Sequence, residues 1–565
     1  MKTHQIILIG IISTLVACAD QLTSEDHREV DSRIDNKQQN PTAVAGKSQI
    51  LTDRSASSIG PQIAQEMFAS PARHKSSYSR YVPIYQNLES HQDRENYQFR
   101  GENPVKLAIE EPVSTFSIDV DTAAYSNIRR MLSREGRLPP KDAVKAEEMI
   151  NYFSYTYPSP KENEAPFSVV TEIATSPWNK DRYLMQVGLK GYEIDQKVRP
   201  DANLVFLIDV SGSMQSSDKL GLVKKSLQLL VHKMKEQDSI ALVVYAGAAG
   251  IVLEPTSGKD KAKIINALDS LEAGGSTNGG AGIQLAYNVA QQQFIEGGIN
   301  RVVIASDGDM NVGIVNHEAL KNLIEEKRDS GIALTTLGFG NGNYNDALME
   351  QLADIGNGNA AYIDSLQEAN KVLVKEMHST LLTIAKDVKI QVEFNPAVVA
   401  EYRLIGYQNR LLNREDFTND KVDAGDIGAG HTVTALYEVS LVGGNSTMIP
   451  DRRYSTEHKP LTQEVGELAY IKLRYKRPEH QHSKEFSKIV YVNDISHHLD
   501  KAGKDLRFAA SVAGFAQLLR GGIHIGDWGY ADLLTLARAA KDDDRHGYRG
   551  EFISLVELAK NLSEH

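Results

Sequence analysis

The sequence predicts an α/β protein: a doubly wound, mostly parallel sheet inserted in or flanked by a β-sandwich, with helical segments at the N- and C-terminal ends. Three observations predict this fold class. Residues 200–380 alternate short apolar runs with amphipathic stretches, as strands and crossover helices do. Alternation with a period of two recurs on both sides of this block, as expected for half-buried antiparallel strands. The length of 565 residues exceeds what one hydrophobic core organises, so several domains are expected.

Five apolar runs in the middle block read as buried strands, because they are short and bounded by turn residues. The stretch at 218–234 presents an apolar stripe at helical spacing. Ligands of such sheets bind beyond the carboxyl ends of the strands, so the residues that follow each run are the first candidates for a site. The expected strands are 204–208, 240–245, 301–305, 332–337 and 360–363, and the stripe consists of Leu220, Val223, Leu227, Leu230 and Met234.

Period-two alternation marks further strands outside this block. One, at 183–189, precedes the block, and others, at 388–394, 433–441 and 471–475, follow it. One strand before and several after predict a β-sandwich into which the middle domain is inserted. The prediction requires the segment around Leu184 to pair with a strand beyond residue 385.

Composition sets the remaining boundaries. A polar stretch without a sustained period follows the N-terminus and predicts a flexible tether. The expected order is a signal peptide at 1–17, the tether at 18–77, a mostly helical domain at 78–160, a β segment at 161–199 that pairs with the later sandwich, the α/β domain at 200–380, the sandwich at 381–495 and a helical segment at 496–565.

The N-terminus predicts export, because a basic residue, Lys2, precedes an apolar stretch that ends in small residues. The sequence "LVAC" at 15–18 resembles the lipobox of bacterial lipoproteins. The resemblance implies that Cys18, the only cysteine of the chain, carries acyl chains such as palmitate and anchors the protein to a membrane. Ala19 implies sorting to the outer membrane, on its periplasmic or surface face. The alternative is a buried cysteine in a retained helix.

Three polar stretches follow strand ends or precede a helix in the middle block: "DVSGSM" at 209–214, "GGSTNGG" at 274–280 and "SDGDMN" at 306–311. Their oxygens predict a site for a hard cation, Mg²⁺ or alternatively Mn²⁺ or Ca²⁺, because hydroxyls with few carboxylates suit such ions. Two serines separated by one residue point the same way in an extended loop. The candidate metal ligands are Asp209, Ser211, Ser213, Thr277 and Asp307.

A purely structural interpretation of these residues stays open. Ser213 could cap the helix that begins near Asp218, and Thr277 or Asn278 could cap the next helix. What favours the metal is the joint occurrence of the residues, in order, at the expected strand ends.

This arrangement resembles the metal-ion-dependent adhesion site of von Willebrand factor A (VWA) domains, whose fold is Rossmann-like. The stretch "TTLGFGNGNYNDALMEQLADIGNGNAAYIDS" also resembles the closing third of bacterial members. The resemblance implies that Ser211, Ser213 and Thr277 contact the metal directly, while Asp209 and Asp307 do so directly or through water. A partner's Asp or Glu would take the open position. The whole layout is similar to bacterial lipoproteins that carry this domain.

A rival signal lies at "FSIDVDTAAYS", where Asp119 and Asp121 resemble the first motif of haloacid-dehalogenase-type phosphatases. The alternative is that both carboxylates cap the following helix.

We therefore expect a binding module rather than an enzyme: an envelope-anchored protein that grips an acidic residue of a protein partner through its bound cation, in adhesion or envelope assembly. A metal-dependent hydrolase or phosphatase using Asp119 and Asp121, and a structural envelope scaffold, are the alternatives. The net charge of −12 argues against a nucleic-acid partner.

Overall fold

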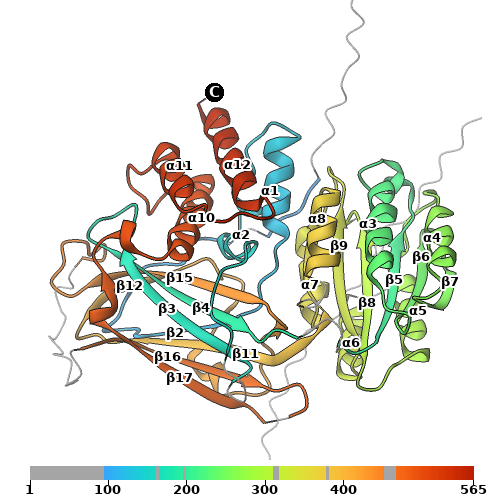
Figure 1. The fold of residues 1–565 in the computed structure, drawn as a ribbon, viewed down its shortest axis with the longest axis horizontal. Coiled ribbons are helices and arrows are strands. Elements are labelled where there is room, and N and C mark those ends of the chain that lie inside the picture. The colour runs from blue at the N-terminus through green and yellow to red at the C-terminus, as the bar shows by residue number, and fades with distance from the viewer. Residues whose placement is uncertain are drawn as a thin grey trace, which may run out of the picture. The chain divides into compact units, whose positions relative to one another are not determined.

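The computed structural model describes residues 94–98, 100–160, 165–194, 199–308, 317–376, 379, 381–450, 466–480 and 482–564 (Figure 1). The predictions of a signal peptide, a lipidated Cys18 and a tether lie outside these residues. Within the described ranges, no helix combines the length and the apolar character that a bilayer crossing requires.

The middle of the chain forms a six-stranded sheet in the order β10-β9-β8-β5-β6-β7. All its neighbouring strands are parallel except β6 and β7, so the predicted mostly parallel sheet is confirmed. The antiparallel edge strand β7 was not predicted, because its exposed residues and its proline hide the alternation. The strands are β5 (Ala202–Asp209), β6 (Ser239–Tyr245), β7 (Ala249–Ser257), β8 (Ile299–Ser306), β9 (Ala333–Phe339) and β10 (Ala360–Ile363).

Helices cover both faces of this sheet, as a doubly wound fold requires. One face packs its aliphatic side chains against α3, α4 and the segment after α8, and the other packs against α5, α6 and α7. The predicted stripe from Leu220 to Met234 is buried on the first face. The helices are α3 (Leu220–Lys233), α4 (Lys261–Asp269), α5 (Gly279–Gln292), α6 (His317–Asp329), α7 (Asp346–Ile355) and α8 (Leu366–Asn370).

Two further sheets enclose a second core and form the predicted sandwich. The strand β4 (Tyr183–Gly191) pairs antiparallel with β15 (Thr432–Leu441), so the segment around Leu184 has the expected partner. The α/β domain is therefore inserted between β4 and β11. The other long strands are β3 (Phe167–Thr175), β11 (Thr383–Phe394), β12 (Val399–Ile405), β16 (Glu467–Lys476) and β17 (Lys484–Tyr491), and the short ones are β13 (Leu411–Leu412), β14 (Gly425–Gly428) and β18 (Ile495–Ser496).

The prediction that residues 78–160 are mostly helical needs correction. Within the described part, β1 (Lys106–Leu107) and β2 (Val113–Ser117) belong to the two sheets of the sandwich, where β2 pairs with β11. The strand β2 has β-branched and aromatic residues that favour a pleated, half-buried surface. Its five residues are too few for a clear alternation.

A helical layer packs on the sandwich and joins the two ends of the described chain. It consists of α1 (Ala123–Ser133), α2 (Ala146–Asn151), α10 (Lys504–Arg520), α11 (Tyr530–Ala539) and α12 (Tyr548–Ser563). In Figure 1 the blue α1 lies beside the red C-terminal helices. Buried Arg129 of α1 reaches Glu368 of the inserted domain at 2.7 Å and Glu551 of α12 at 2.9 Å, so one side chain links three parts of the fold.

Candidate metal site and its relatives

The fold brings the two predicted aspartates to one edge of the parallel sheet. Asp209 is the last residue of β5, and Asp307 directly follows Ser306, the last residue of β8. The two strands are parallel neighbours, so their carboxyl ends meet at the same edge. Both aspartates are fully buried as residues.

Asp209 is held by three donors. Its Oδ1 accepts a hydrogen bond from the Ser211 backbone N–H at 2.9 Å, and its Oδ2 accepts from the hydroxyls of Tyr245 and Ser306, each at 3.1 Å. Burial raises the pKa of Asp209 despite these bonds, and the nearby charge of Asp307 adds to the rise. A cation at this edge would stabilise the ionised form of the carboxyl.

The two serines converge as predicted. The Oγ atoms of Ser211 and Ser213 lie 3.0 Å apart, and Ser213 also hydrogen-bonds Asp307. The helix α3 begins later, at Leu220, with Lys219 at its N-cap position and no side-chain cap bond. The interpretation of Ser213 as a helix cap is therefore not what the structure shows.

The loop that carries Thr277 lies against the serine loop. The backbone N–H of Gly212 donates to Gly275 O at 3.0 Å, and that of Gly274 donates to Val210 O at 2.7 Å. Thr277 follows in this loop, half-buried, shortly before α5. The N-cap residue of α5 is Asn278, which makes no side-chain cap bond.

Two residues that the sequence analysis missed complete the site. The Lys219 ammonium lies 2.9 Å from Asp307 Oδ2, and Asn343 donates to the same oxygen at 3.0 Å. Lys219 is 7 % exposed, and a Cβ on Gly340 would meet its stem at 2.3 Å, so a glycine makes room for the lysine. Burial alone would raise the pKa of Asp307, but the charge and hydrogen bond of Lys219 outweigh it and the pKa lies below its usual value.

The donor set fits a hard divalent cation. Its side chains offer carboxylate and hydroxyl oxygens without histidine or cysteine, as Mg²⁺ prefers. Two carboxylates and one ammonium leave a net protein charge of −1 beside the ion. With a divalent ion bound, the site would therefore keep one positive charge, which an incoming carboxylate could neutralise.

Asp119 and Asp121, the residues of the rival hypothesis, lie elsewhere. Both pair with Arg410, at 3.2 and 3.1 Å respectively, and Asp121 is 3 % exposed and accepts from the Ala360 backbone N–H at 2.6 Å. They do not cap α1 as the alternative proposed. That end is capped by Glu148, whose Oε2 accepts from the Ala124 N–H at 2.9 Å.

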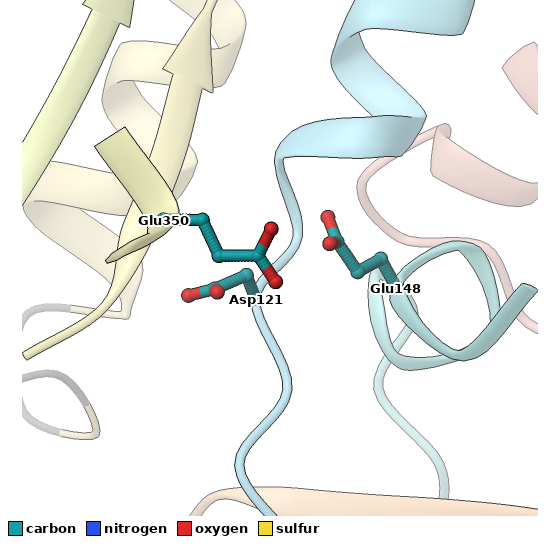
Figure 2. Close-up of side chains that lie close together, drawn as sticks. All are labelled: Asp121, Glu148 and Glu350. Carbon is teal, nitrogen blue, oxygen red and sulfur yellow. The ribbon is translucent and has the colours of Figure 1, made fainter. Parts of the chain in front are cut away.

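These aspartates belong to a buried carboxylate network between the inserted domain, the N-terminal helices and the sandwich. Figure 2 shows the side chains of Asp121, Glu148 and Glu350 close together, with one oxygen of each within 4.8 Å of the others. The network consists of Asp119, Asp121, Glu148, Asp346, Glu350 and Asp354 with the cations Lys145 and Arg410.

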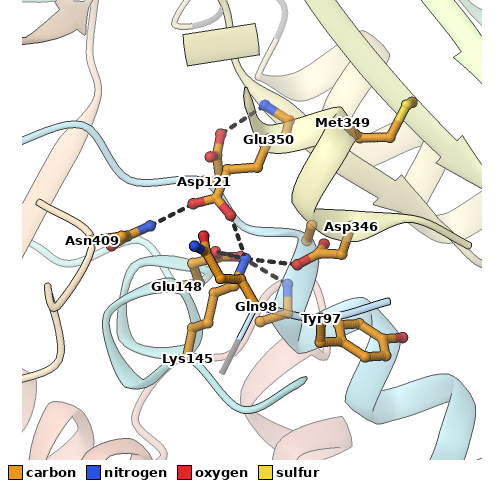
Figure 3. A network of polar contacts seen from close by, with 12 residues as sticks. Tyr97, Gln98, Asp121, Lys145, Glu148, Asp346, Met349, Glu350 and Asn409 are labelled. Carbon is orange, nitrogen blue, oxygen red and sulfur yellow. Dashed lines mark hydrogen bonds and ion pairs between the residues drawn. The ribbon is translucent and has the colours of Figure 1, made fainter. Parts of the chain in front are cut away.

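Lys145 is the centre of this network (Figure 3). Its ammonium lies 2.7 Å from Asp346, 2.9 Å from Glu350 and 2.9 Å from Glu148. Six carboxylates face only two cations, so full ionisation would leave an excess of four negative charges. Burial accordingly raises the pKa of Glu148 to about 7 and that of Asp354 to about 7.

Comparison with known families supports the assignment of the inserted domain. The family model described as "von Willebrand factor type A domain" matches residues 203–376, and one described as "von Willebrand factor" matches residues 91–186. A third, described as "Uncharacterized protein YfbK, C-terminal", matches residues 379–562.

Individual relatives agree with these matches. The Escherichia coli protein named "Uncharacterized protein YfbK" is 46% identical over 477 residues, which cover 83% of this chain and 81% of the relative. The Synechocystis protein sll0103 is 28% identical over 196 residues, 35% of this chain and 45% of the relative. Among solved structures, von Willebrand factor type A from Catenulispora acidiphila matches 69% of this chain and 90% of its own, with 14% identity and a TM-score of 0.39.

The relationship to the E. coli protein extends across the helical layer, the sandwich and the inserted domain. On the strength of that identity and coverage, the chain belongs to the YfbK family of VWA-domain proteins.

Proposed function

We propose that this protein binds a divalent cation at the edge formed by β5 and β8 and, through the cation, an acidic residue of a protein partner. VWA domains often bind divalent cations and typically mediate protein interactions. The observation that carries the proposal is the convergence of Asp209, Ser211, Ser213 and Asp307 at one sheet edge, beside the loop of Thr277. The residual positive charge of the loaded site favours a carboxylate as the last ligand.

We further propose that the protein is a binding module, anchored in the bacterial envelope through Cys18, and not an enzyme. Metal-assisted hydrolysis needs a general base next to the open coordination position. Among the described residues at the edge, Lys219 pairs with Asp307, and Tyr245 donates to Asp209.

The first prediction concerns metal-dependent capture. Asp209→Ala and Ser211→Ala should each abolish Mg²⁺-dependent retention of envelope proteins on the immobilised chain, because each removes an oxygen ligand. Ser217→Ala, which changes an exposed serine of the same loop, is the matched control and should retain capture. The measurement is a pull-down from envelope extract with Mg²⁺ and with EDTA, together with titration of Mg²⁺ by calorimetry.

Capture that survives both ligand substitutions would contradict the proposal. Mg²⁺ binding without any captured carboxylate-bearing partner would favour the structural scaffold. Turnover of phosphate esters that disappears in Asp119→Ala would favour the hydrolase.

The second prediction concerns Lys219, whose replacement should change Mg²⁺ affinity and carboxylate capture in opposite directions. Replacing it by methionine removes a positive charge close to the metal ligands, so Mg²⁺ should bind about tenfold more tightly or better. The loaded site then becomes neutral, and the capture of a carboxylate should weaken. Calorimetry with Mg²⁺ measures the first effect, and retention of the captured partner measures the second. Weaker Mg²⁺ binding in Lys219→Met would show instead that the lysine mainly positions Asp307.

A further inference from the structure

Arg301, near the start of β8, is a buried cation without a counter-ion. It lies on the same face of the sheet as Val303 and is 4 % exposed. One guanidinium nitrogen donates to Thr335 Oγ1 at 2.6 Å, while the buried Nε has no hydrogen-bond partner. Within the described ranges, no carboxylate forms an ion pair with this guanidinium.

The other buried arginines of the described chain differ from Arg301 in this respect, because each of them contacts a carboxylate. The pairs are Arg129 with Glu368, Arg130 with Glu95, Arg182 with Glu401, Arg199 with Asp238 and Arg403 with Glu438, at 2.6 to 3.1 Å. An unpaired buried charge is costly, so the exception requires a reason.

The acidic group that acts on Arg301 electrostatically does not neutralise it. Asp426 of β14 acts on it electrostatically without an ion pair, and burial raises the pKa of Asp426 to about 8. At neutral pH this carboxyl is mostly protonated. Burial also lowers the pKa of Arg301, to about 10, so the guanidinium stays charged at neutral pH with no anion beside it.

Arg301 and Thr335 line a cleft of about 1000 Å³ between the inserted domain and the sandwich. Its walls come from α6 and β9 of the inserted domain and from β11 and β14 of the sandwich. Two other cations on these walls have carboxylate partners: Lys190 pairs with Glu193 at 3.1 Å, and Arg328 with Asp423 at 2.8 Å. Arg301 differs from these two residues because its guanidinium has no carboxylate partner among the described residues and could bind an anion.

We propose that this cleft binds a small oxyanion, a phosphate or a carboxylate, through the Arg301 guanidinium and the Thr335 hydroxyl. A planar guanidinium offers two parallel donors that match two oxygens of either group, and the low exposure strengthens the interaction. The site is separate from the metal edge. Arg301 lies in β8, and Asp307 directly follows this strand, six residues later. At the usual rise per residue the two are roughly 20 Å apart. An anion held there would contact the walls of both domains.

The test compares wild-type protein with Arg301→Gln and with Lys321→Gln, which removes the same charge from an exposed position of the same cleft, 52% exposed as a side chain. Full-length protein is titrated with sodium phosphate and, separately, sodium acetate, at ionic strength held constant with sodium chloride. Thermal unfolding and calorimetry report binding. We expect saturable binding of at least one anion in the wild type and in Lys321→Gln, and at least a tenfold loss of affinity in Arg301→Gln.

The two anion arms distinguish the sources of the oxyanion. Binding of phosphate alone identifies a phosphoryl ligand, and binding of acetate alone identifies a carboxylate. The absence of any effect beyond that of chloride, or equal affinity in Arg301→Gln, would overturn the proposal. If Arg301→Gln does not fold, Thr335→Val decides, because it keeps the charge and removes the hydroxyl: a severalfold loss supports the site, and unchanged affinity overturns it.

Discussion

Lys145→Met should destabilise the folded protein by about 3–5 kcal/mol at pH 8, the cost typical of removing one partner from a buried ion cluster. The lysine is the cation shared by Asp346, Glu350 and Glu148, and only Arg410 remains once it is lost. Methionine fills a similar volume, so the loss is one of charge and hydrogen bonds more than of packing. Urea unfolding at pH 8 measures the change in the free energy of unfolding.

Lys321→Met is the matched control, since it removes an ammonium whose side chain is 52% exposed and should change stability by less than about 0.5 kcal/mol. The destabilisation by Lys145→Met should also shrink when the pH is lowered, because protonation of the carboxylates replaces the missing cation. Equal stability of Lys145→Met and wild type at pH 8 would mean that the network does not depend on its central charge.

Glu148→Gln should remove part of the pH dependence of stability. The folded pKa of Glu148, about 7, lies above its unfolded value near 4.5, so its contribution is fully present below pH 4.5 and is lost as the pH rises through 7. For one such group the difference between pH 5.5 and pH 8 is about 2 kcal/mol. The glutamine side chain keeps the shape of the glutamate and would face Asp121 and Glu350, whose oxygens lie within 4.8 Å.

The measurement is the free energy of unfolding of wild type and Glu148→Gln at pH 5.5 and pH 8. The free energy of unfolding of Glu148→Gln, relative to that of wild type, should increase by about 2 kcal/mol as the pH rises between these values. His431 and His524, whose pKa values burial lowers to about 4, act in the opposite direction in both proteins and cancel in the comparison. Parallel pH profiles would show that Glu148 is already ionised in the folded state.

The sequence predicted the sheet and the placement of Asp209 and Asp307 at one of its edges because both depend on local patterns. Apolar runs with helical stripes between them fix the strands, and the ends of parallel strands bring Asp209 and Asp307 to one edge. The exposed edge strand β7 and the short strand β2 lack such a pattern, and their pairing depends on distant partners.

Lys219 and Asn343 could not be predicted in the same way. They come from segments more than a hundred residues apart, and a lysine before a helix is usually solvated. Its burial depends on Gly340, whose missing side chain leaves the space that the lysine stem fills. The carboxylate network was equally hidden, because α2, α7 and the loop of Arg410 meet only in the folded chain.

The insertion also determines how the protein would respond to tension. The chain enters the inserted domain after Gly191 and leaves it before Ile384, and a Cβ on Gly191 would meet the Ile384 side chain at 2.8 Å. The two junctions are thus adjacent. Asp209 and Asp307 lie together at the sheet edge away from these junctions, at the carboxyl ends of β5 and β8. A force applied at that far edge would pull along the axes of β5 and β8 and load their interstrand hydrogen bonds together, as in shear, instead of opening them one at a time.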